Sequence, residues 1–367
     1  MLSISVQESY IRRKMASTTF SMDPDTPTTA ATIDSTALYD YNYEDEICNK
    51  ENIQMFGAIF TPLFFSAIVI LSLFGNILVL VILVKYENLK LLTNTLLLNL
   101  VVSDLLFTAG LPFWAYAHVH RWTFGEHACK VVNFIFNTGY YSSGFLLIIM
   151  TAHRYMAVMY PLSDVVSTAG FYSVVASVVL WVGSVLAASP NMIFITVHDN
   201  DFCGYDSSSW NLFDIYMQNL LFLLTSWVFI SCYAQIICRL LRSNAKRRGK
   251  KTLKLIFTLL LVFFVGWAPY NVIIFQKSCE YWKQKVKNPD SMKEDCDRSK
   301  RLDYSLYVGR LFAFSQCCLN PVLYVFVGVK FKSHLRKLLS FKHPNNSVIR
   351  NRQSRLTITS ITSGEEV

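Results

Sequence analysis

The sequence predicts an all-α membrane protein, a bundle of seven transmembrane helices, and its composition and hydropathy carry that prediction. Of the 367 residues, 53% are hydrophobic and 16% are charged, and the mean hydropathy is +0.33. Soluble domains carry about a quarter charged residues, so this composition excludes a soluble multidomain enzyme and a disordered chain. The net charge is +9, and many of the Lys and Arg residues lie beside the apolar stretches. This placement favours membrane lipid and excludes nucleic acid as the partner.

Seven apolar stretches are long enough to cross a bilayer, which takes about 20 residues each. Each is expected to be a helix, because lipid offers no partners to unpaired backbone groups. The third stretch is the most polar, with Asn133, Asn137 and Ser142 inside it, so we expect other helices to surround it. The predicted spans are 57–84, 92–117, 131–159, 171–195, 212–241, 253–276 and 302–326.

Basic residues set the predicted orientation of the spans. Lys and Arg concentrate in 242–254 and in 330–355, and the positive-inside rule places both segments in the cytosol. With seven spans, the N-terminus is then extracellular. The segment 277–301 is also rich in lysine, although this topology makes it an extracellular loop.

The nine cysteines divide between the spans and the outer side. Four lie within predicted spans and are expected to be packing residues: Cys232, Cys238, Cys317 and Cys318. The others lie on the outer side, where disulfides persist: Cys48, Cys129, Cys203, Cys279 and Cys296. Because their number is odd, one of them is left over.

Asp104 lies in the middle of the second span, where a carboxylate is costly and is functional by default. Asn76, Ser143 and Asn320 are expected at a similar depth. Carboxylate, amide and hydroxyl oxygens suit a small hard cation, so we predict an allosteric sodium site and no other cofactor or metal. The alternative is a polar contact that only packs helices together.

Two prolines in the sixth and seventh spans stand beside distinctive side chains. Pro269 follows Trp267 closely, and Pro321 follows Asn320 directly. A buried proline removes a helical hydrogen bond and kinks the helix. We therefore predict an activation switch at these hinges, against the alternative that the kinks only shape the bundle.

The third span ends in His153-Arg154-Tyr155 at the predicted cytosolic face. An arginine at this depth either reaches up to lipid headgroups or binds something in a cytosolic cleft.

The segment before the first span is acidic and rich in tyrosine. It contains Tyr39, Tyr41, Tyr43, Glu44, Asp45 and Glu46. Acid-flanked tyrosines on an extracellular segment are candidate sulfation sites. Together with acids of the second outer loop, this arm would steer a basic ligand. The composition alone is also that of a solvated disordered arm.

The last residues of the chain are rich in hydroxyl side chains: Ser354, Thr357, Thr359, Ser360, Thr362 and Ser363. Their phosphorylation would convert a basic tail into an acidic docking segment. An unstructured end would have a similar sequence.

In combination, several span motifs resemble those of the rhodopsin-like G protein-coupled receptors over about 57–340. They are Gly75-Asn76, Asn99, Asp104, Cys129, Arg154, Trp181, Trp267, Pro269, Asn320-Pro321 and Tyr324. The segment Gly328 to Leu339 is similar to that family's short cytosolic amphipathic helix. The implied domains are an extracellular arm (1–56), a transmembrane domain (57–326), a membrane-surface helix (327–340) and a cytosolic tail (341–367).

Within that family, the outer features resemble those of the chemokine receptors. The resemblance lies in the acidic tyrosine arm with Cys48, Pro112-Phe113-Trp114, Arg121-Trp122-Thr123-Phe124-Gly125 and Cys317-Cys318-Leu319-Asn320-Pro321. His153 before Arg154, where most of the family has Asp, is similar to the XC-chemokine branch. The seventh-span position that is usually Glu is Arg310, so this pocket is not expected to capture the amine of a small-molecule antagonist in the usual way.

The resemblance implies a receptor of the plasma membrane that is not an enzyme. A basic chemokine, XC class first, would bind the acidic arm together with Trp114, Phe136 and Arg310. A heterotrimeric G protein, inhibitory in class, would couple through His153, Arg154, Tyr155, Tyr233 and Tyr324, and chemotaxis and calcium signalling would follow. Arrestin and receptor kinases would act on the tail. The implied disulfides are Cys129–Cys203 and Cys48–Cys296, which leaves Cys279 over.

The alternative to a receptor is a secondary transporter with its ion site at Asp104. The sequence shows no internal repeat and no matching pair of interrupted helices, which transporters of that kind carry. It also lacks the paired catalytic acids and metal-ligand cluster of an intramembrane enzyme.

Overall fold

A computed structural model of the chain describes residues 48–160, 169–198, 201–242, 246–284, 292–327 and 334–335. The acidic tyrosine arm, nearly all of the expected membrane-surface helix and the hydroxyl-rich tail lie outside these residues.

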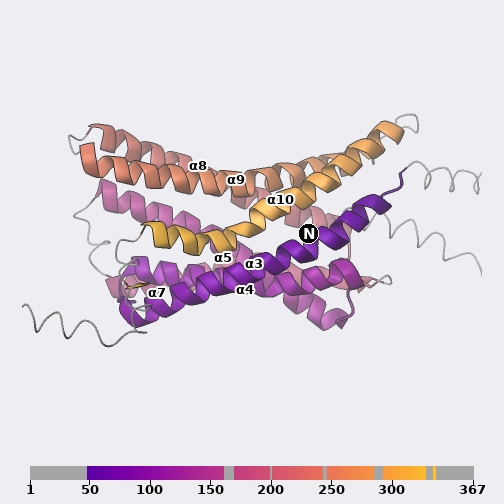
Figure 1. Cartoon of the computed structure of the whole chain (residues 1–367), viewed down its shortest axis with the longest axis horizontal. Helices are drawn as coiled ribbons and strands as arrows, with labels where there is room; N and C mark the ends of the chain where they lie inside the picture. The colour runs from indigo at the N-terminus through magenta and orange to yellow at the C-terminus, as the bar shows by residue number, and fades with distance from the viewer. Residues whose placement is uncertain are drawn as a thin grey trace, which may run out of the picture.

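Seven long helices lie side by side in the described part of the chain and form one elongated bundle (Figure 1). They are α3 (Glu51–Tyr86), α4 (Leu92–His120), α5 (Gly125–Met159), α7 (Ala169–Phe194), α8 (Ser208–Arg242), α9 (Lys246–Gln284) and α10 (Met292–Val327). Their contacts close a ring in the order α3, α4, α5, α8, α9, α10 and back to α3, with α7 packed on α4 and α5. The predicted bundle of seven helices is confirmed.

The outer surface of the bundle is apolar. On α3, Leu63, Ile70 and Phe74 are about 70% exposed, while Phe65 and Ile68 on the same helix are buried. A helix that is apolar on all sides is typical of a membrane span. Within the described residues, five helices are long and apolar enough to cross a membrane by themselves: α3, α4, α7, α8 and α9.

Helices α5 and α10 do not reach that hydropathy within their described residues. Both carry polar groups that face other helices, such as Asn133 and Asn137 on α5 and Gln316 on α10, all of which are buried. Helix α5 contacts α4, α7, α8 and the two short strands. The expectation that the most polar span is surrounded by other helices is therefore confirmed.

The helices are longer than the predicted spans. Helix α3 begins at Glu51 rather than 57, and α9 continues to Gln284 rather than 276. Helix α10 begins at Met292, so the polar loop predicted over 277–301 is wrong over most of its length. Hydropathy locates the part of a helix that lies in lipid, and lysine and glutamate continue a helix readily beyond that part.

One close approach of two helices requires a glycine. A Cβ atom on Gly139 of α5 would lie 2.4 Å from the backbone nitrogen of Phe107 and 2.8 Å from the carbonyl oxygen of Ser103, both on α4. Backbone atoms cannot move aside as a side chain can. This contact holds α4 against α5 at the depth of Asp104, which directly follows Ser103 and lies about one turn before Phe107.

The second outer loop contains an antiparallel hairpin that the sequence did not predict. Strand β1 (Ile195–His198) pairs with β2 (Phe202–Tyr205), and Ile195 lies opposite Tyr205. Asp201 precedes β2 with a φ of 53°, a conformation that aspartate tolerates better than most residues. The hairpin lies against the outer end of α5.

Candidate functional site

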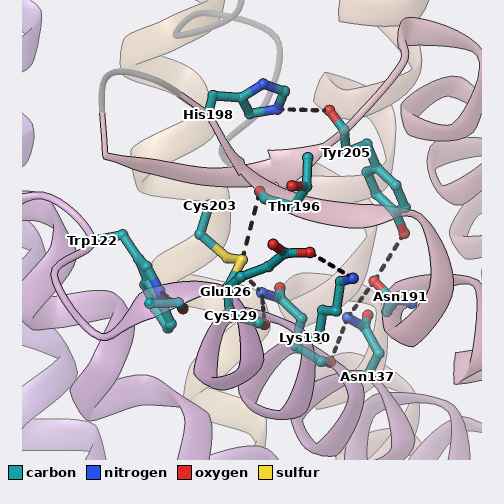
Figure 2. Close-up of a disulfide and its surroundings, with 12 residues drawn as sticks. Trp122, Glu126, Cys129, Lys130, Asn137, Asn191, Thr196, His198, Cys203 and Tyr205 are labelled. Atoms are coloured by element: carbon teal, nitrogen blue, oxygen red, sulfur yellow. Dashed lines mark hydrogen bonds and ion pairs between the residues drawn. A yellow bond between two sulfur atoms is a disulfide. The ribbon is translucent and has the colours of Figure 1, made fainter.

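The hairpin is fixed over the bundle by the predicted disulfide between Cys129 and Cys203 (Figure 2). Asn133 lies one turn below and donates from Nδ2 to the Cys129 carbonyl at 2.8 Å and to Cys203 Sγ at 3.1 Å. The backbone nitrogen of Trp122, in the loop between α4 and α5, donates to the Asp201 carbonyl at 2.8 Å. The hairpin is therefore held at three points against α5 and the loop between α4 and α5.

Glu126 and Lys130 form an exposed ion pair of 2.7 Å on the first turns of α5, beside this disulfide (Figure 2). The hydrogen bond from Lys130 lowers the pKa of Glu126. Both residues belong to α5, so this pair does not hold the hairpin, and exposed pairs of this kind contribute little to stability.

The second predicted disulfide, Cys48–Cys296, joins the start of the described chain to α10. Buried ion pairs reinforce it. Asp303 Oδ2 lies 3.1 Å from Lys50 Nζ, and Asp303 Oδ1 binds Lys277 Nζ of α9. Both predicted disulfides are thus confirmed. Cys279 is in neither, as expected.

An outer cavity brings together the three ligand-binding residues predicted within the bundle. Trp114 of α4, Phe136 of α5 and Arg310 of α10 line one space of about 360 Å³, which includes volume open to solvent. The remaining lining residues are Phe65, His118, Asn133, Asn137 and Phe314. Arg310 is 6% exposed. The predicted arm residues Tyr39, Tyr41, Tyr43, Glu44, Asp45 and Glu46 lie outside the described residues.

A buried polar network next to this cavity was not predicted. Asn191 Oδ1 accepts hydrogen bonds from Asn137 Nδ2 at 2.9 Å and from the Tyr205 hydroxyl at 2.8 Å (Figure 2). The network continues to Asp214 of α8, whose carboxylate interacts with Tyr205 and accepts hydrogen bonds from the Tyr141 hydroxyl at 3.5 Å and from Gln218 Nε2 at 2.8 Å. It ties strand β2 to α5, α7 and α8. An acid within a predicted span was the signal that could have found Asp214.

At mid-depth, Asp104 is surrounded by most of its predicted partners. Asn320 Nδ2 donates to both carboxylate oxygens at 3.2 and 3.0 Å, and the Ser143 hydroxyl donates at 3.3 Å. Asn76 belongs to a neighbouring contact instead. Its Nδ2 donates to the Cys317 carbonyl at 3.0 Å and to Ser72. Three of the four predicted sodium-site residues are therefore in direct contact.

Two of the predicted switch residues, Trp267 and Asn320, lie near Asp104. Trp267 of α9 lines the same cavity of about 550 Å³ as Asp104 and Asn320. Its ring packs edge-on against Tyr140 of α5 at 5.2 Å between centroids. Pro269 and Pro321 are inside α9 and α10, as predicted.

An inner cavity lies nearer to the cytosolic ends predicted for the helices. Arg154 and Tyr233 line it together with Thr151, Phe263 and Asn320. Within the described residues, Arg154 makes no hydrogen bond or ion pair. Its neighbour Tyr155 is half-buried and packs against a cluster that includes Tyr233, and the Tyr155 hydroxyl donates to Gln235 of α8 at 2.9 Å.

The structure gives less detail on the two other predicted coupling residues, His153 and Tyr324. His153 is half-buried next to Arg154 on α5. Tyr324 lies on α10, and the structure does not describe its side chain. Of the expected membrane-surface helix only His334 and Leu335 are described, and the His334 ring stacks on Tyr86 of α3 at 5.1 Å.

Comparison with known proteins agrees with this geometry. The family model of the 7 transmembrane receptor (rhodopsin family) matches residues 75–324. The chain is 39% identical to Chemokine XC receptor 1 of Homo sapiens over 306 residues, which are 83% of this chain and 89% of that protein. It is similarly 39% identical to Chemokine XC receptor 1 of Mus musculus over 83% of this chain and 90% of that protein.

A third relative carries a different chemokine class in its name. C-C chemokine receptor type 3 of Cavia porcellus is 37% identical over 314 residues, which are 83% of this chain and 85% of that protein. None of these relatives is a transporter or an enzyme, and the family consists of receptors. The bundle, its two outer disulfides and these matches agree, and the chain belongs to the rhodopsin family of seven-transmembrane receptors and, within it, to the chemokine receptors.

Proposed function

We propose that this receptor binds a basic chemokine of the XC class outside the cell and activates a heterotrimeric G protein of the inhibitory class inside it. One observation carries the proposal. The bundle holds an outer cavity, a middle cavity lined by Trp267 and Asp104, and an inner cavity lined by Arg154, and the middle and inner cavities share wall residues such as Asn320. A ligand that moved Trp267 would change the packing between the two cavities, since packed interfaces switch between discrete arrangements.

The orientation and the ligand class complete the proposal. The basic segments near α9 and after α10 favour a cytosolic C-terminus and an extracellular arm in the plasma membrane. The names of two relatives favour the XC class over the C-C class. Receptor kinases and arrestin are proposed to act on the hydroxyl-rich tail, and chemotaxis and calcium signalling are the expected responses.

Nucleotide exchange tests the proposal directly. Purified receptor in lipid nanodiscs is mixed with an inhibitory-class G protein, and GTP binding is followed after adding an XC chemokine. We expect stimulation by the XC chemokine, and weaker stimulation by a C-C chemokine at equal concentration. Equal stimulation by the two would refute the XC assignment, and none by either would refute the receptor function proposed here.

Sodium is expected to favour the resting state through Asp104. The carboxylate, the Ser143 hydroxyl and the Asn320 side chain converge in one buried cavity. Gln316 Oε1 borders the same cavity and has no hydrogen-bond partner among the described residues. Hard oxygen donors suit sodium, and an ion that binds one state better shifts the population toward that state.

We therefore expect Asp104→Asn to abolish the effect of sodium on agonist affinity, measured as agonist Kd in sodium chloride against choline chloride. Asn76→Ala is the matched comparison, because Asn76 does not contact the carboxylate. An undiminished sodium effect in Asp104→Asn would exclude this site.

The acidic arm is expected to capture the ligand. Replacing Tyr39, Tyr41 and Tyr43 together by Phe removes any sulfate groups and should weaken chemokine binding. Wild-type affinity should fall more steeply with salt than that of the variant, because exposed charges are screened beyond about 8 Å at physiological ionic strength. Kd is measured at several salt concentrations. The same affinity for both proteins at every salt concentration would contradict the prediction.

A further inference from the structure

A buried chain of polar side chains runs from the outer hairpin to α9. The Tyr270 hydroxyl of α9 donates to Gln218 Oε1 of α8 at 2.9 Å, and Gln218 Nε2 donates to Asp214 Oδ2 at 2.8 Å. The Asp214 carboxylate also interacts with the side chain of Tyr205 on β2. We call these four residues the outer relay: Tyr205, Asp214, Gln218 and Tyr270. None is more than 4% exposed, so solvent cannot replace a lost partner.

Gln218 is the residue that joins the two ends of the outer relay. A phenol can donate to its Oε1, and a carboxylate can accept from its Nε2. The side chain of Gln218 therefore satisfies Tyr270 and Asp214 at the same time. A buried polar group without a partner is costly, so a displacement at one end of the relay favours a matching displacement at the other.

The α9 end of the outer relay lies at a proline. Tyr270 directly follows Pro269 inside α9, and its ring centroid lies 6.4 Å from that of Trp267. Pro269 cannot donate a helical hydrogen bond, which weakens α9 at this point. The bond from Tyr270 to Gln218 therefore fixes α9 to α8 beside the weak point and within one turn of Trp267.

The other end of the outer relay belongs to the hairpin (Figure 2). Tyr205 is the last residue of β2 and lies opposite Ile195, and Cys203, two residues earlier, forms the disulfide to α5. The Tyr205 hydroxyl donates to Asn191 Oδ1 of α7 at 2.8 Å. Because its backbone is part of the hairpin, Tyr205 must follow any movement of β2.

We infer that Asp214 and Gln218 are positioning residues that couple the second outer loop to α9. A chemokine that displaced the hairpin would shift Tyr205, and the hydrogen bonds on α8 would pass this shift to Tyr270 and the proline beside it. Packed helices convert small shifts of this kind into discrete rearrangements. The inference rests on the proposed function, and it requires no part of the ligand to enter the bundle. None of the four relay residues lines the outer, middle or inner cavity.

The test removes one hydroxyl at each end of the outer relay, as Tyr205→Phe, Tyr270→Phe and the double variant. Tyr141→Phe is the matched control. Tyr141 is 2% exposed, approaches Asp214 only to 3.5 Å, and has no hydrogen bond to α9 within the described residues. For each receptor in lipid nanodiscs, we measure the Kd of a recombinant XC chemokine without G protein, the maximal nucleotide exchange that it drives, and the Tm.

Each single relay variant is expected to lower maximal chemokine-driven exchange about fivefold, the effect of one buried hydrogen bond, with Kd nearly unchanged. The double variant should lose no more than either single variant, because the relay is already broken, and such non-additivity is the sign of coupled residues. Tyr141→Phe should behave as wild type. Residues that only stabilised the fold would change Tm and not the exchange per folded receptor.

Asp214 separates the hydrogen bonds of the relay from its charge. Asp214→Asn keeps an acceptor for Gln218, and its amide can donate to the Tyr205 oxygen, whose own proton goes to Asn191. This variant should retain most of the exchange, whereas Asp214→Leu should lose as much as the tyrosine variants. If Asp214→Leu fails to reach the membrane, the phenylalanine variants and their double variant decide.

Four results would overturn the inference: wild-type exchange in Tyr270→Phe, additive losses in the double variant, an equal loss in Tyr141→Phe, or a loss in Asp214→Asn as large as in the tyrosine variants. All four leave the proposed function intact, because wild-type receptor still drives exchange. Absence of chemokine-driven exchange in wild type would instead contradict the proposed function and, with it, the inference.

Discussion

Arg154→Ala is expected to abolish nucleotide exchange on the G protein while leaving chemokine affinity nearly unchanged. Arg154 and Tyr233 line the inner cavity, and no residue that lines this cavity also lines the outer cavity. Since Arg154 has no ion pair or hydrogen bond in the described part of the chain, its removal leaves no buried partner behind. The loss is therefore expected in signalling and not in folding.

His153→Asp tests what restrains Arg154. A neutral histidine forms no ion pair with the neighbouring guanidinium, and a protonated one repels it. The restraint in the resting state is then the packing around Tyr155, whose hydroxyl binds Gln235. An aspartate would add an ion pair worth up to about 1 kcal/mol if the site is wet, which lowers basal exchange several-fold.

Basal and chemokine-driven exchange are measured for wild type and both variants at matched surface expression. Arg239→Ala is the control, because Arg239 lies at the same end of the bundle and its hydrogen bonds within the described residues go to Met159. Full coupling by Arg154→Ala would show that another residue carries the signal. Unchanged basal exchange in His153→Asp would refute only the explanation of the missing restraint.

Asp303→Asn is expected to be the most destabilising single change at the outer end. It leaves Lys277 buried without the carboxylate that it binds, and breaking a buried pair in this way costs about 3–5 kcal/mol. Lys50 is more exposed, at 16%, and can turn to solvent. The double variant Asp303→Asn/Lys277→Met removes the stranded charge and should recover much of the loss.

Thermal unfolding of the purified receptor measures this effect. Glu126→Gln is the control, because it breaks an exposed pair with Lys130 and should change stability by less than about 1 kcal/mol. A wild-type Tm for Asp303→Asn would show that the pair contributes nothing. A double variant less stable than Asp303→Asn alone would show that Lys277 is held by other contacts.

The sequence predicted the helices because lipid imposes a strong and local constraint on each span. It predicted their ends poorly, since Glu51 and Gln284 lie beyond the apolar part of their helices. It missed the hairpin because strands of four residues give almost no periodic signal. A pattern along the chain shows which segments cross the membrane, and it does not show which loop folds back on itself.

The sequence also predicted some residues of the candidate sites and missed others. Asp104 was predicted as a site residue because a carboxylate in the middle of an apolar span is rare and is visible in the sequence alone. Asp303 was missed because it stands near the start of a predicted span, where an acid is ordinary. The role of Asp303 depends on its ion pairs with Lys277 on the preceding helix and Lys50 at the start of the described chain. Such pairings depend on how helices pack, and no short-range pattern encodes them.

The Cys48–Cys296 bridge also sets the geometry of a tether. It fixes the root of the extracellular arm to α10, with 5.5 Å between the two Cα atoms. Arg310 lies fourteen residues further along the same helix, or about 21 Å at 1.5 Å per residue. Under the proposed function, entry into the outer cavity of a chemokine held by the arm would then be an intramolecular step. A short flexible connection gives such a step an effective concentration on the order of millimolar, and opening the bridge would lower that concentration without removing a single ligand contact.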